Sequence, residues 1–121
     1  MTENQLIRDI FDMNYDDIVS QLEESIEIDG GIQDMMYESE TMILEVEWKV
    51  DCRIHKYPET REAPAEMVVS NLETSAPMIH RGEYLDEVSE EWYELPHEIL
   101  SELEERLEDP FLAQVELLCS D

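Results

Sequence analysis

The sequence predicts an α+β fold, in which a small antiparallel sheet of two to four strands is flanked by acidic N- and C-terminal helices. Two observations predict it. Apolar residues recur at helical spacing towards both ends of the chain, whereas in the middle they alternate with polar residues, as in a half-buried strand. The 121 residues are enough for one domain and too few for two, so we expect residues 1–121 to form a single domain.

The N-terminal segment predicts two short helices. Thr2 is the expected N-cap of the first, whose apolar face comprises Leu6, Ile7, Ile10 and Phe11. Asn14 is the expected N-cap of the second, because asparagine favours that position. Gly30-Gly31 ends this second helix, whose apolar face comprises Ile18, Val19, Leu22 and Ile26. Residues 26–37 also allow a second interpretation, a hairpin around Asp29-Gly30.

The middle of the chain predicts the sheet. In residues 44–55 every second residue is apolar, which predicts a strand with one buried face. Pro58 and Pro64 bound a turn. After it, residues 65–74 are expected to return as a second, antiparallel strand, and residues 78–84 to add a short third one.

The C-terminal segment predicts two further helices. Pro96 suits the first turn of a helix, because proline already has the backbone angle that a helix needs. The apolar stripe of that helix comprises Ile99, Leu100, Leu103 and Leu107. Asp109-Pro110 is expected to stop it, because a proline removes a helical hydrogen bond. A last short helix is then expected from Phe111, Leu112, Val115, Leu118 and Cys119.

The charge of the chain is large and unevenly distributed. Acidic residues number 33 and basic residues 7, for a formal net charge of −26. Residues 1–40 hold twelve acids and one base, and residues 83–121 hold fourteen acids and one base, whereas the middle is nearly neutral. Such a field repels nucleic acid and anionic membranes and attracts a basic partner. Most helical surfaces intersperse lysine with glutamate because the pairs are stabilising, so the missing bases suggest that the field itself is useful.

No motif in the sequence points to an enzyme or to a cofactor. No glycine-rich phosphate loop, nucleophile elbow or CxxC occurs, and His55, His80 and His97 share no metal-ligand spacing with each other or with the cysteines. Cys52 and Cys119 are too few for a disulfide framework and are expected to be reduced. The start, MTENQLIRDIF, has neither a basic n-region nor a long apolar run, so we expect a cytoplasmic protein.

Residues 12–23 partly match a calcium-binding EF-hand loop. Oxygen ligands stand at the expected positions, namely Asp12, Asn14, Asp16, Ser20 and Glu23. Asp17 occupies the place where the loop needs a glycine, and Glu24 and Glu27 spoil the apolar flank of the helix that should follow. We therefore favour a helix start at Asn14, with acids in its first turn.

The acids of the end segments are spaced to form two carboxylate ridges. If residues 87–109 are helical, with a bend at Pro96, one ridge contains Glu87, Glu91, Glu94, Glu98, Glu102, Glu105 and Asp109. A second ridge contains Asp9, Asp12, Asp16, Asp17, Glu23, Glu24 and Glu27. Trp92 and Tyr93 lie within the first ridge. Either Trp92 packs its helix onto the sheet, or the two aromatic residues are anchors of an interface.

The segments Asp9–Glu27 and Glu83–Asp109 resemble those of small phage-encoded proteins that mimic nucleic acid. This resemblance implies a non-enzymatic inhibitor that blocks the basic groove of a host DNA- or RNA-binding defence protein of the CRISPR or restriction type. Such mimics share no common fold. The middle, EVEWKVDCRIHKYPETREAPAEMVVSNLE, resembles a strand–turn–strand pattern of small uncharacterised phage proteins, which implies phage origin and action in the host cytoplasm. No catalytic residue carries over.

Two other functions fit the same residues. The first is a small structural or adaptor protein whose charge provides solubility or tolerance of salt, which includes halophile adaptation. The excess of Glu over Asp argues against halophile adaptation. The second is a calcium-binding module at Asp12–Glu23. The alternating strand and the apolar stretch FLAQVELLC also allow a homodimer interface.

Overall fold

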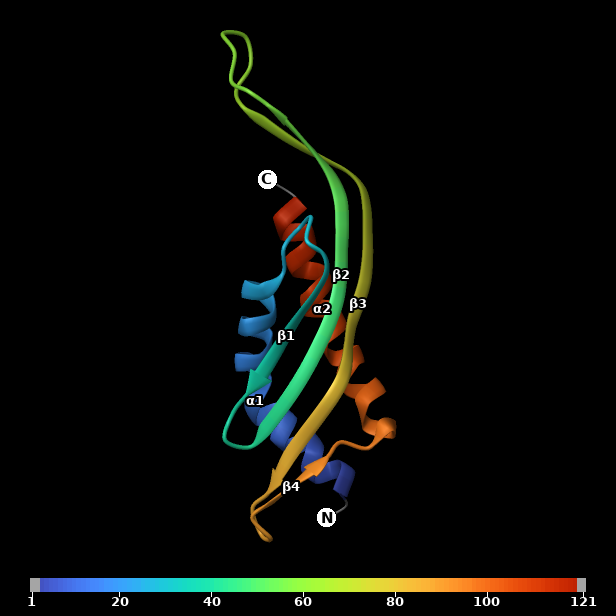
Figure 1. The fold of residues 1–121 in the computed structure, drawn as a ribbon. Coiled ribbons are helices and arrows are strands. Elements are labelled where there is room, and N and C mark those ends of the chain that lie inside the picture. Colours follow the sequence, from blue (N-terminus) through green and yellow to red (C-terminus); the bar gives the residue numbers. More distant parts are fainter. Residues whose placement is uncertain (1–2, 120–121) are drawn as a thin grey trace.

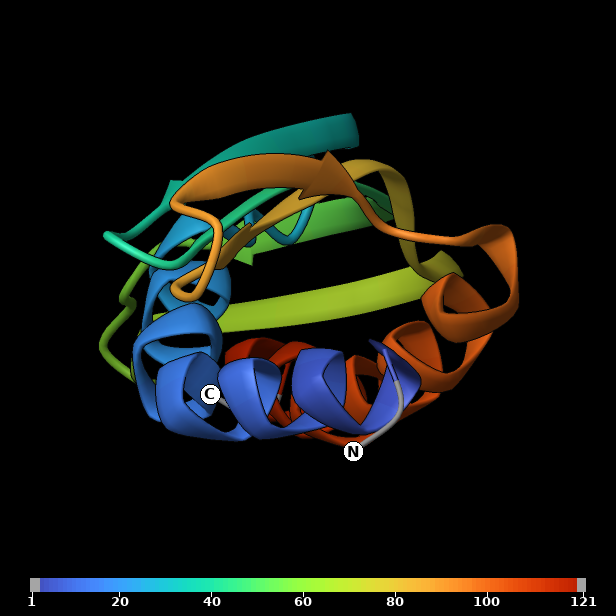
Figure 2. The same cartoon turned by 90° about the horizontal axis from the view of Figure 1, so that it is seen from below.

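The computed structural model describes residues 3–119, apart from the side chain of Met67. Along the chain the elements are α1 (Glu3–Ser25), β1 (Gly31–Glu38), β2 (Met42–Tyr57), β3 (Glu66–Asp86), β4 (Glu91–Glu94) and α2 (His97–Cys119). The strands form one antiparallel sheet in the order β1-β2-β3-β4 (Figure 1). Both helices cover the same face of this curled sheet (Figure 2). The predicted α+β fold is confirmed.

The core lies between the sheet and the two helices. On β2, the alternating residues Leu44, Val46, Trp48 and Val50 are buried, as the pattern of residues 44–55 predicted. The helices contribute the stripes expected of them, and the largest side chain of α2 in the core is the fully buried Phe111. Burying one such side chain contributes about 1.5–3 kcal/mol to folding, so this apolar core holds the two helices on the sheet.

The two predicted N-terminal helices are a single helix, α1, and Asn14 lies inside it. The Asn14 Nδ2 donates to the carbonyl oxygen of Ile10 at 2.8 Å and to the Thr41 Oγ1 at 3.0 Å, and its Oδ1 accepts from the Tyr37 hydroxyl at 2.9 Å. A mid-helix asparagine normally competes for nearby backbone groups. Here Thr41 and Tyr37, from outside the helix, also bond to its amide, so the helix continues. The predicted cap Thr2 lies outside the described residues.

The segment after α1 is a turn followed by a strand. The helix ends at Ser25, before the predicted Gly30-Gly31. Residues 31–38 form β1, so Asp29-Gly30 lies in a helix–strand turn rather than in a hairpin. Gly31 has φ +68°, a left-handed conformation that suits glycine, and it begins the strand.

The two predicted C-terminal helices are also a single helix, α2, which continues through Pro110. Proline has no N–H to bond to the carbonyl four residues earlier, which here belongs to Arg106. The Tyr15 hydroxyl of α1 donates to that carbonyl oxygen at 3.3 Å. A side chain from the neighbouring helix thus replaces the lost helical bond, which explains why the predicted stop at Asp109-Pro110 is absent.

The predicted second and third strands form one long strand, β3. The break was expected around residues 75–77, and the pairing with β2 is irregular there: Glu47 pairs with Met78, whereas Lys49 pairs with Ser75. A bulge leaves residues out of the ladder, so Pro77 is tolerated without ending the strand. The outer halves of β2 and β3, with the turn between them, extend beyond the helices (Figure 1). We call residues 51–75 the arm.

Candidate partner-binding surface

The C-terminal carboxylate ridge does not exist as one helical surface. Glu91 and Glu94 belong to β4, which pairs with the end of β3, and Glu87 lies in the turn between these strands. The N–H of Leu95 bonds to the carbonyl oxygen of Gly82, which keeps the chain against the sheet up to Pro96. Four members of the predicted ridge remain together on α2, at helical spacing: Glu98, Glu102, Glu105 and Asp109.

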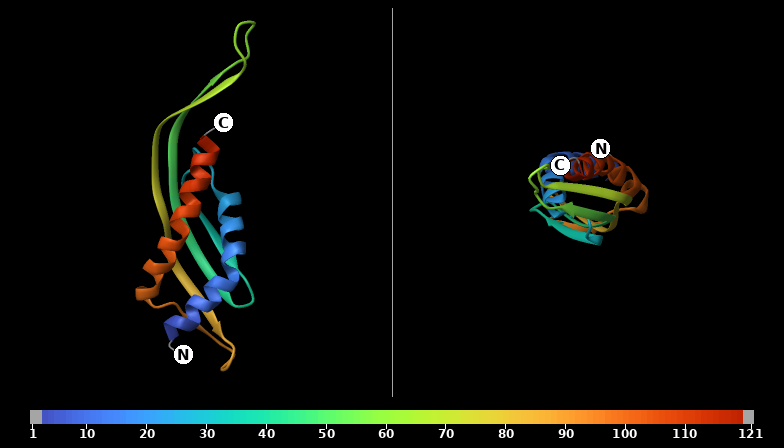
Figure 3. Two further views of the ribbon diagram at one scale, coloured as in Figure 1. Left: turned by 180° about the vertical axis from the view of Figure 1, so that it is seen from behind. Right: turned by 90° about the horizontal axis from the view of Figure 1, so that it is seen from above.

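The structure places the two acidic helices side by side, although about 70 residues separate them in the sequence (Figure 3). The Arg8 guanidinium on α1 donates to both Glu102 carboxylate oxygens on α2, at 2.7 and 2.9 Å. Arg106 on α2 pairs with Asp12 on α1. Its guanidinium also lies over the Phe11 ring, at 4.9 Å from the centroid. These contacts lock the helices in one layer.

The same contacts define which acids face solvent. On α1, Asp9, Asp16 and Glu23 recur every seven residues, on the side roughly opposite the buried apolar stripe, and Asp12 lies beside them towards α2. We call the outer surface of the helix layer the anionic face, formed by Asp9, Asp12, Asp16 and Glu23 of α1 and Glu98, Glu102, Glu105 and Asp109 of α2. Asp17 and Glu24 fall on the other flank of α1, and Glu27 lies beyond its end.

The basic residues of the helix layer form ion pairs between the two helices. Each helix has 23 residues with seven acids and a single lysine or arginine, Arg8 in α1 and Arg106 in α2. Both arginines pair across the helix contact. The hydrogen bonds from Arg8 lower the pKa of Glu102 and raise that of Arg8 itself. Six acids of the anionic face make no ion pair within residues 3–119, namely Asp9, Asp16, Glu23, Glu98, Glu105 and Asp109.

The uncovered face of the sheet is different. Its acids are interspersed with cations, and three pairs bridge them: Lys49 with Glu73, Arg81 with Glu83, and His80 with Glu47. The hydrogen bond from Arg81 to Glu83 raises the pKa of the arginine. The remaining bases, Arg53, Lys56 and Arg61, all lie on the arm, and in the described part of the chain they make no ion pair. On the helix layer, by contrast, the acids are not interspersed with cations, because each helix has one arginine and both arginines pair between the helices.

Trp92 and Tyr93 belong to β4, so Trp92 does not pack a helix onto the sheet. Each is 41% exposed. Because successive side chains of a strand point to opposite faces, the two do not form one anchor. Trp92 lies opposite Leu85 of β3, and Tyr93 lies opposite the buried Tyr84, with ring centroids 5.9 Å apart.

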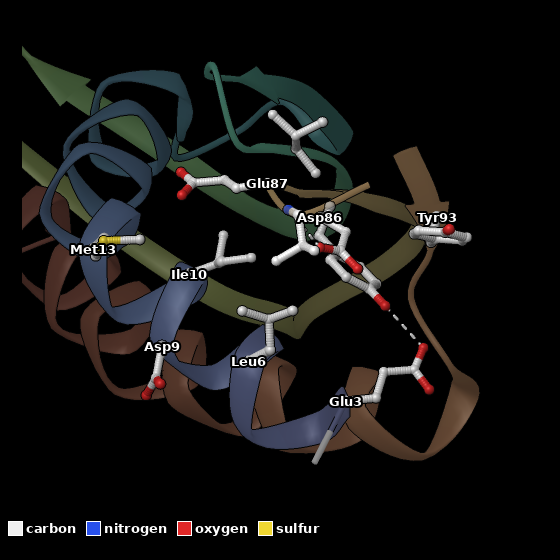
Figure 4. Close-up of a pocket in the computed structure, with 11 residues that line it drawn as sticks. Glu3, Leu6, Asp9, Ile10, Met13, Asp86, Glu87 and Tyr93 are labelled. Atoms are coloured by element: carbon white, nitrogen blue, oxygen red, sulfur yellow. Dashed lines mark hydrogen bonds between the residues drawn. The ribbon is translucent and has the colours of Figure 1, made fainter. Parts of the chain in front are cut away.

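A pocket lies between α1 and the β3–β4 turn (Figure 4). Its volume is about 710 Å³. Leu6, Ile10 and Met13 line it from α1, and Tyr84 and Tyr93 line it from the sheet. Asp9 belongs both to this pocket and to the anionic face. No local pattern in the sequence indicates the pocket, because its walls come from distant segments. Two of its apolar lining residues, Met13 and Val88, are 70% and 96% exposed.

The calcium-binding loop that residues 12–23 partly match is absent. Residues 12–23 are helical throughout, so their oxygens do not surround a common point. Within residues 3–119 no three histidine, cysteine, aspartate or glutamate side chains are grouped to hold a metal ion.

In the described part of the chain, neither helix is apolar enough over a sufficient length to cross a membrane. The thiols of Cys52 and Cys119 are free, and burial raises the pKa of both.

The chain matches no protein-family model, no curated protein sequence and no solved structure.

Proposed function

We propose that the protein is a non-enzymatic inhibitor whose anionic face occupies the basic groove of a nucleic-acid-binding protein and competes with the nucleic acid. The observation that carries the proposal is the division of charge in the helix layer. Six carboxylates from two distant segments share its outer surface and make no ion pair within residues 3–119, while both of its arginines pair between the helices. The resemblance to phage-encoded mimics suggests a defence protein of the CRISPR or restriction type as the target.

The spacing of these carboxylates supports binding to a groove made for phosphates. Acids three or four residues apart on α2 are separated by about 4.5–6 Å along the helix axis. Phosphates of one DNA strand follow each other at about 3.4 Å of axial rise, and further apart along the helical path. Arginine and lysine side chains that bind phosphate also bind carboxylate, through similar charge-assisted hydrogen bonds. One cationic groove thus accommodates either surface.

A pair of matched variants tests this function. The face variant neutralises four acids of the anionic face, with the substitutions Asp9→Asn, Asp16→Asn, Glu98→Gln and Glu105→Gln. The control variant neutralises four exposed acids elsewhere, with the substitutions Asp34→Asn, Glu38→Gln, Glu40→Gln and Glu59→Gln. Both variants change the net charge equally. Unequal behaviour therefore reports on the position of the charge rather than on its amount.

The unmodified chain is first used to capture partners from a bacterial lysate, and the affinity of a captured nucleic-acid-binding protein is then measured. We expect DNA or RNA to displace the chain, binding to weaken as salt rises, and the face variant to lose most of the affinity that the control variant keeps. Equal binding by the two variants, or a partner that binds nucleic acid and the chain simultaneously, contradicts the proposal. In the first case the charge serves solubility instead.

A further inference from the structure

The pocket beside α1 combines an apolar floor with a carboxylate rim. Leu6, Ile10 and Met13 form one wall, and Tyr93 faces them (Figure 4). The rim contains four acids, namely Glu3, Asp9, Asp86 and Glu87, and none of the lining residues within 3–119 is basic. Its volume of about 710 Å³ falls within the range of about 300–1,000 Å³ that is usual for ligand sites.

Internal hydrogen bonds hold three of the four rim carboxylates in place. Glu3 accepts from the Tyr84 hydroxyl at 2.9 Å, Asp86 from the backbone N–H of Val88 at 2.9 Å, and Asp9 from the Gln5 amide at 3.0 Å. Burial, with the hydrogen bond to Glu3, raises the pKa of Tyr84 to about 12, so its hydroxyl stays a donor well into the alkaline range. A carboxylate that accepts one hydrogen bond keeps further acceptor positions for a ligand.

Charge complementarity indicates what this pocket takes. An apolar floor binds aliphatic or aromatic groups, and an acidic rim without bases favours a neighbouring cation. Leucine or phenylalanine next to arginine supplies both, and the face of Tyr93 can receive the guanidinium. Because Asp9 belongs to rim and anionic face alike, a basic chain lying along the helix layer reaches the pocket directly.

We propose that this pocket anchors a short basic segment of the partner protein, in which an apolar side chain fills the floor and an adjacent arginine or lysine binds the rim. This inference rests on the proposed function for the identity of the partner, but the site is tested with peptides alone. The probes are a capped Leu-Arg peptide and its Leu-citrulline analogue, which keeps the shape and lacks the charge.

The methyl resonance of Met13, followed by NMR in the full chain, reports binding at the floor. We expect the Leu-Arg peptide to shift it saturably and the citrulline analogue to bind at least about tenfold more weakly, a difference of about 1.4 kcal/mol. The pocket variant Met13→Gln/Glu87→Gln lacks this reporter, so its binding is followed by the methyl resonances of Leu6, which also lines the pocket. This variant is expected to lose about tenfold or more in affinity for the Leu-Arg peptide. The control variant Leu112→Gln/Glu108→Gln, altered at exposed sites of α2, keeps its affinity.

Three outcomes overturn the proposal: no shift of the Met13 resonance, equal binding of the two peptides, or equal loss in both variants. A simple alkylammonium salt that binds as tightly as the Leu-Arg peptide also overturns it, because the site would then belong to a small organic cation. A pocket that fails these tests leaves capture of a partner by the anionic face intact. A pocket that passes them stands even if no nucleic-acid-binding partner exists.

Discussion

The body of the protein and its arm use the same sheet in opposite ways. In the body, residues 3–50 and 76–119, two helices cover the sheet, and Trp48 and Phe111 are almost fully buried between the helices and the sheet. In the arm, residues 51–75, the two strands extend past the helices and mostly contact each other (Figure 1). Every lysine and arginine of the described body is in an ion pair. The three bases that make no ion pair with any described residue are all on the arm.

The body and the arm are therefore expected to differ in stability. A two-stranded ribbon without a covering layer is marginally stable in water, so the arm is expected to open locally at lower free energy than the body. The body must tolerate the repulsion among its helix-layer acids, and it does so with a dense apolar core and two ion pairs between the helices. Removing apolar contacts in the body should therefore lower the free energy of unfolding far more than removing apolar contacts in the arm.

The largest contrast is expected between apolar truncations in the two regions. Phe111→Ala removes a fully buried ring from the body and should destabilise the fold by about 3–5 kcal/mol. Tyr57→Ala removes a ring that is 54% exposed on the arm, and its effect should stay within about 0.5 kcal/mol. Urea denaturation followed by circular dichroism measures both. Similar losses for the two substitutions would remove the distinction between body and arm.

The buried amide of Asn14 should have the next largest effect. Asn14→Ala leaves the Tyr37 hydroxyl without its partner and should cost about 1–3 kcal/mol. Adding Tyr37→Phe removes the orphaned hydroxyl, so its cost in the Asn14→Ala background should be smaller than in the unmodified chain. A double-mutant cycle measures this coupling. Strict additivity of the two substitutions would show that the hydrogen bond contributes nothing.

The contact between Tyr15 and α2 should contribute about 1 kcal/mol. Tyr15→Phe leaves the carbonyl of Arg106 unbonded, because Pro110 provides no N–H. Pro110→Ala restores a helical donor to that carbonyl, so Tyr15→Phe should be nearly neutral in the Pro110→Ala background. Denaturation of the four proteins gives the answer. If Tyr15→Phe costs the same in both backgrounds, the tyrosine does not replace the missing helical bond.

Tyr84 should make the stability of the body depend on pH in alkaline solution. Its pKa is raised to about 12 from the ordinary value of 10.0, so the unfolded chain loses this proton first. The associated stability is complete below pH 10 and is lost as the pH rises towards about 12. Tyr84→Phe should reduce the alkaline loss of stability, whereas Tyr57→Phe on the arm should leave it unchanged; Tyr37, whose pKa burial also raises, contributes to the remainder. Denaturation midpoints measured across this pH range test the assignment to Tyr84. If the midpoints of Tyr84→Phe and the unmodified chain are identical, Tyr84 does not cause the alkaline loss.

Removing most of the arm should have the smallest effect on the body. Asp51 pairs with Glu73, so an Asn-Gly turn can replace residues 52–72 and close the hairpin at that pair. The removed segment holds three acids and three bases, so the formal net charge stays at −26. We expect unchanged helical circular dichroism and a similar denaturation midpoint. A shortened chain that unfolds would show that the arm supports the body.

The alternation of residues 44–55 and the apolar stripes of the ends predicted the sheet and both helical segments, because these patterns follow directly from burial on one face. The predicted breaks at Asn14 and Pro110 were wrong, because Tyr37, Thr41 and Tyr15 satisfy from a distance the groups that would locally end a helix. The segment containing Trp92 was misassigned because its acids fit a helical period, whereas pairing with β3 makes it a strand.

The candidate surface was predicted in part. The sequence identified the acid-rich segments, and helical periodicity placed Glu98, Glu102, Glu105 and Asp109 together. It did not show that α1 lies beside α2, since that arrangement depends on contacts such as Arg8 with Glu102. The pocket depends on packing between α1 and the end of the sheet, which no local pattern encodes.

We propose that the outer sides of α1 and α2 together form one continuous anionic surface that attracts cationic ligands. This surface can be located by titrating the full, isotope-labelled chain with a polyarginine peptide and following the titration by NMR. We expect the largest saturable shifts along the outer sides of α1 and α2, with small shifts on the arm and on the uncovered face of the sheet. Shifts of equal size at acidic residues all over the molecule would contradict it.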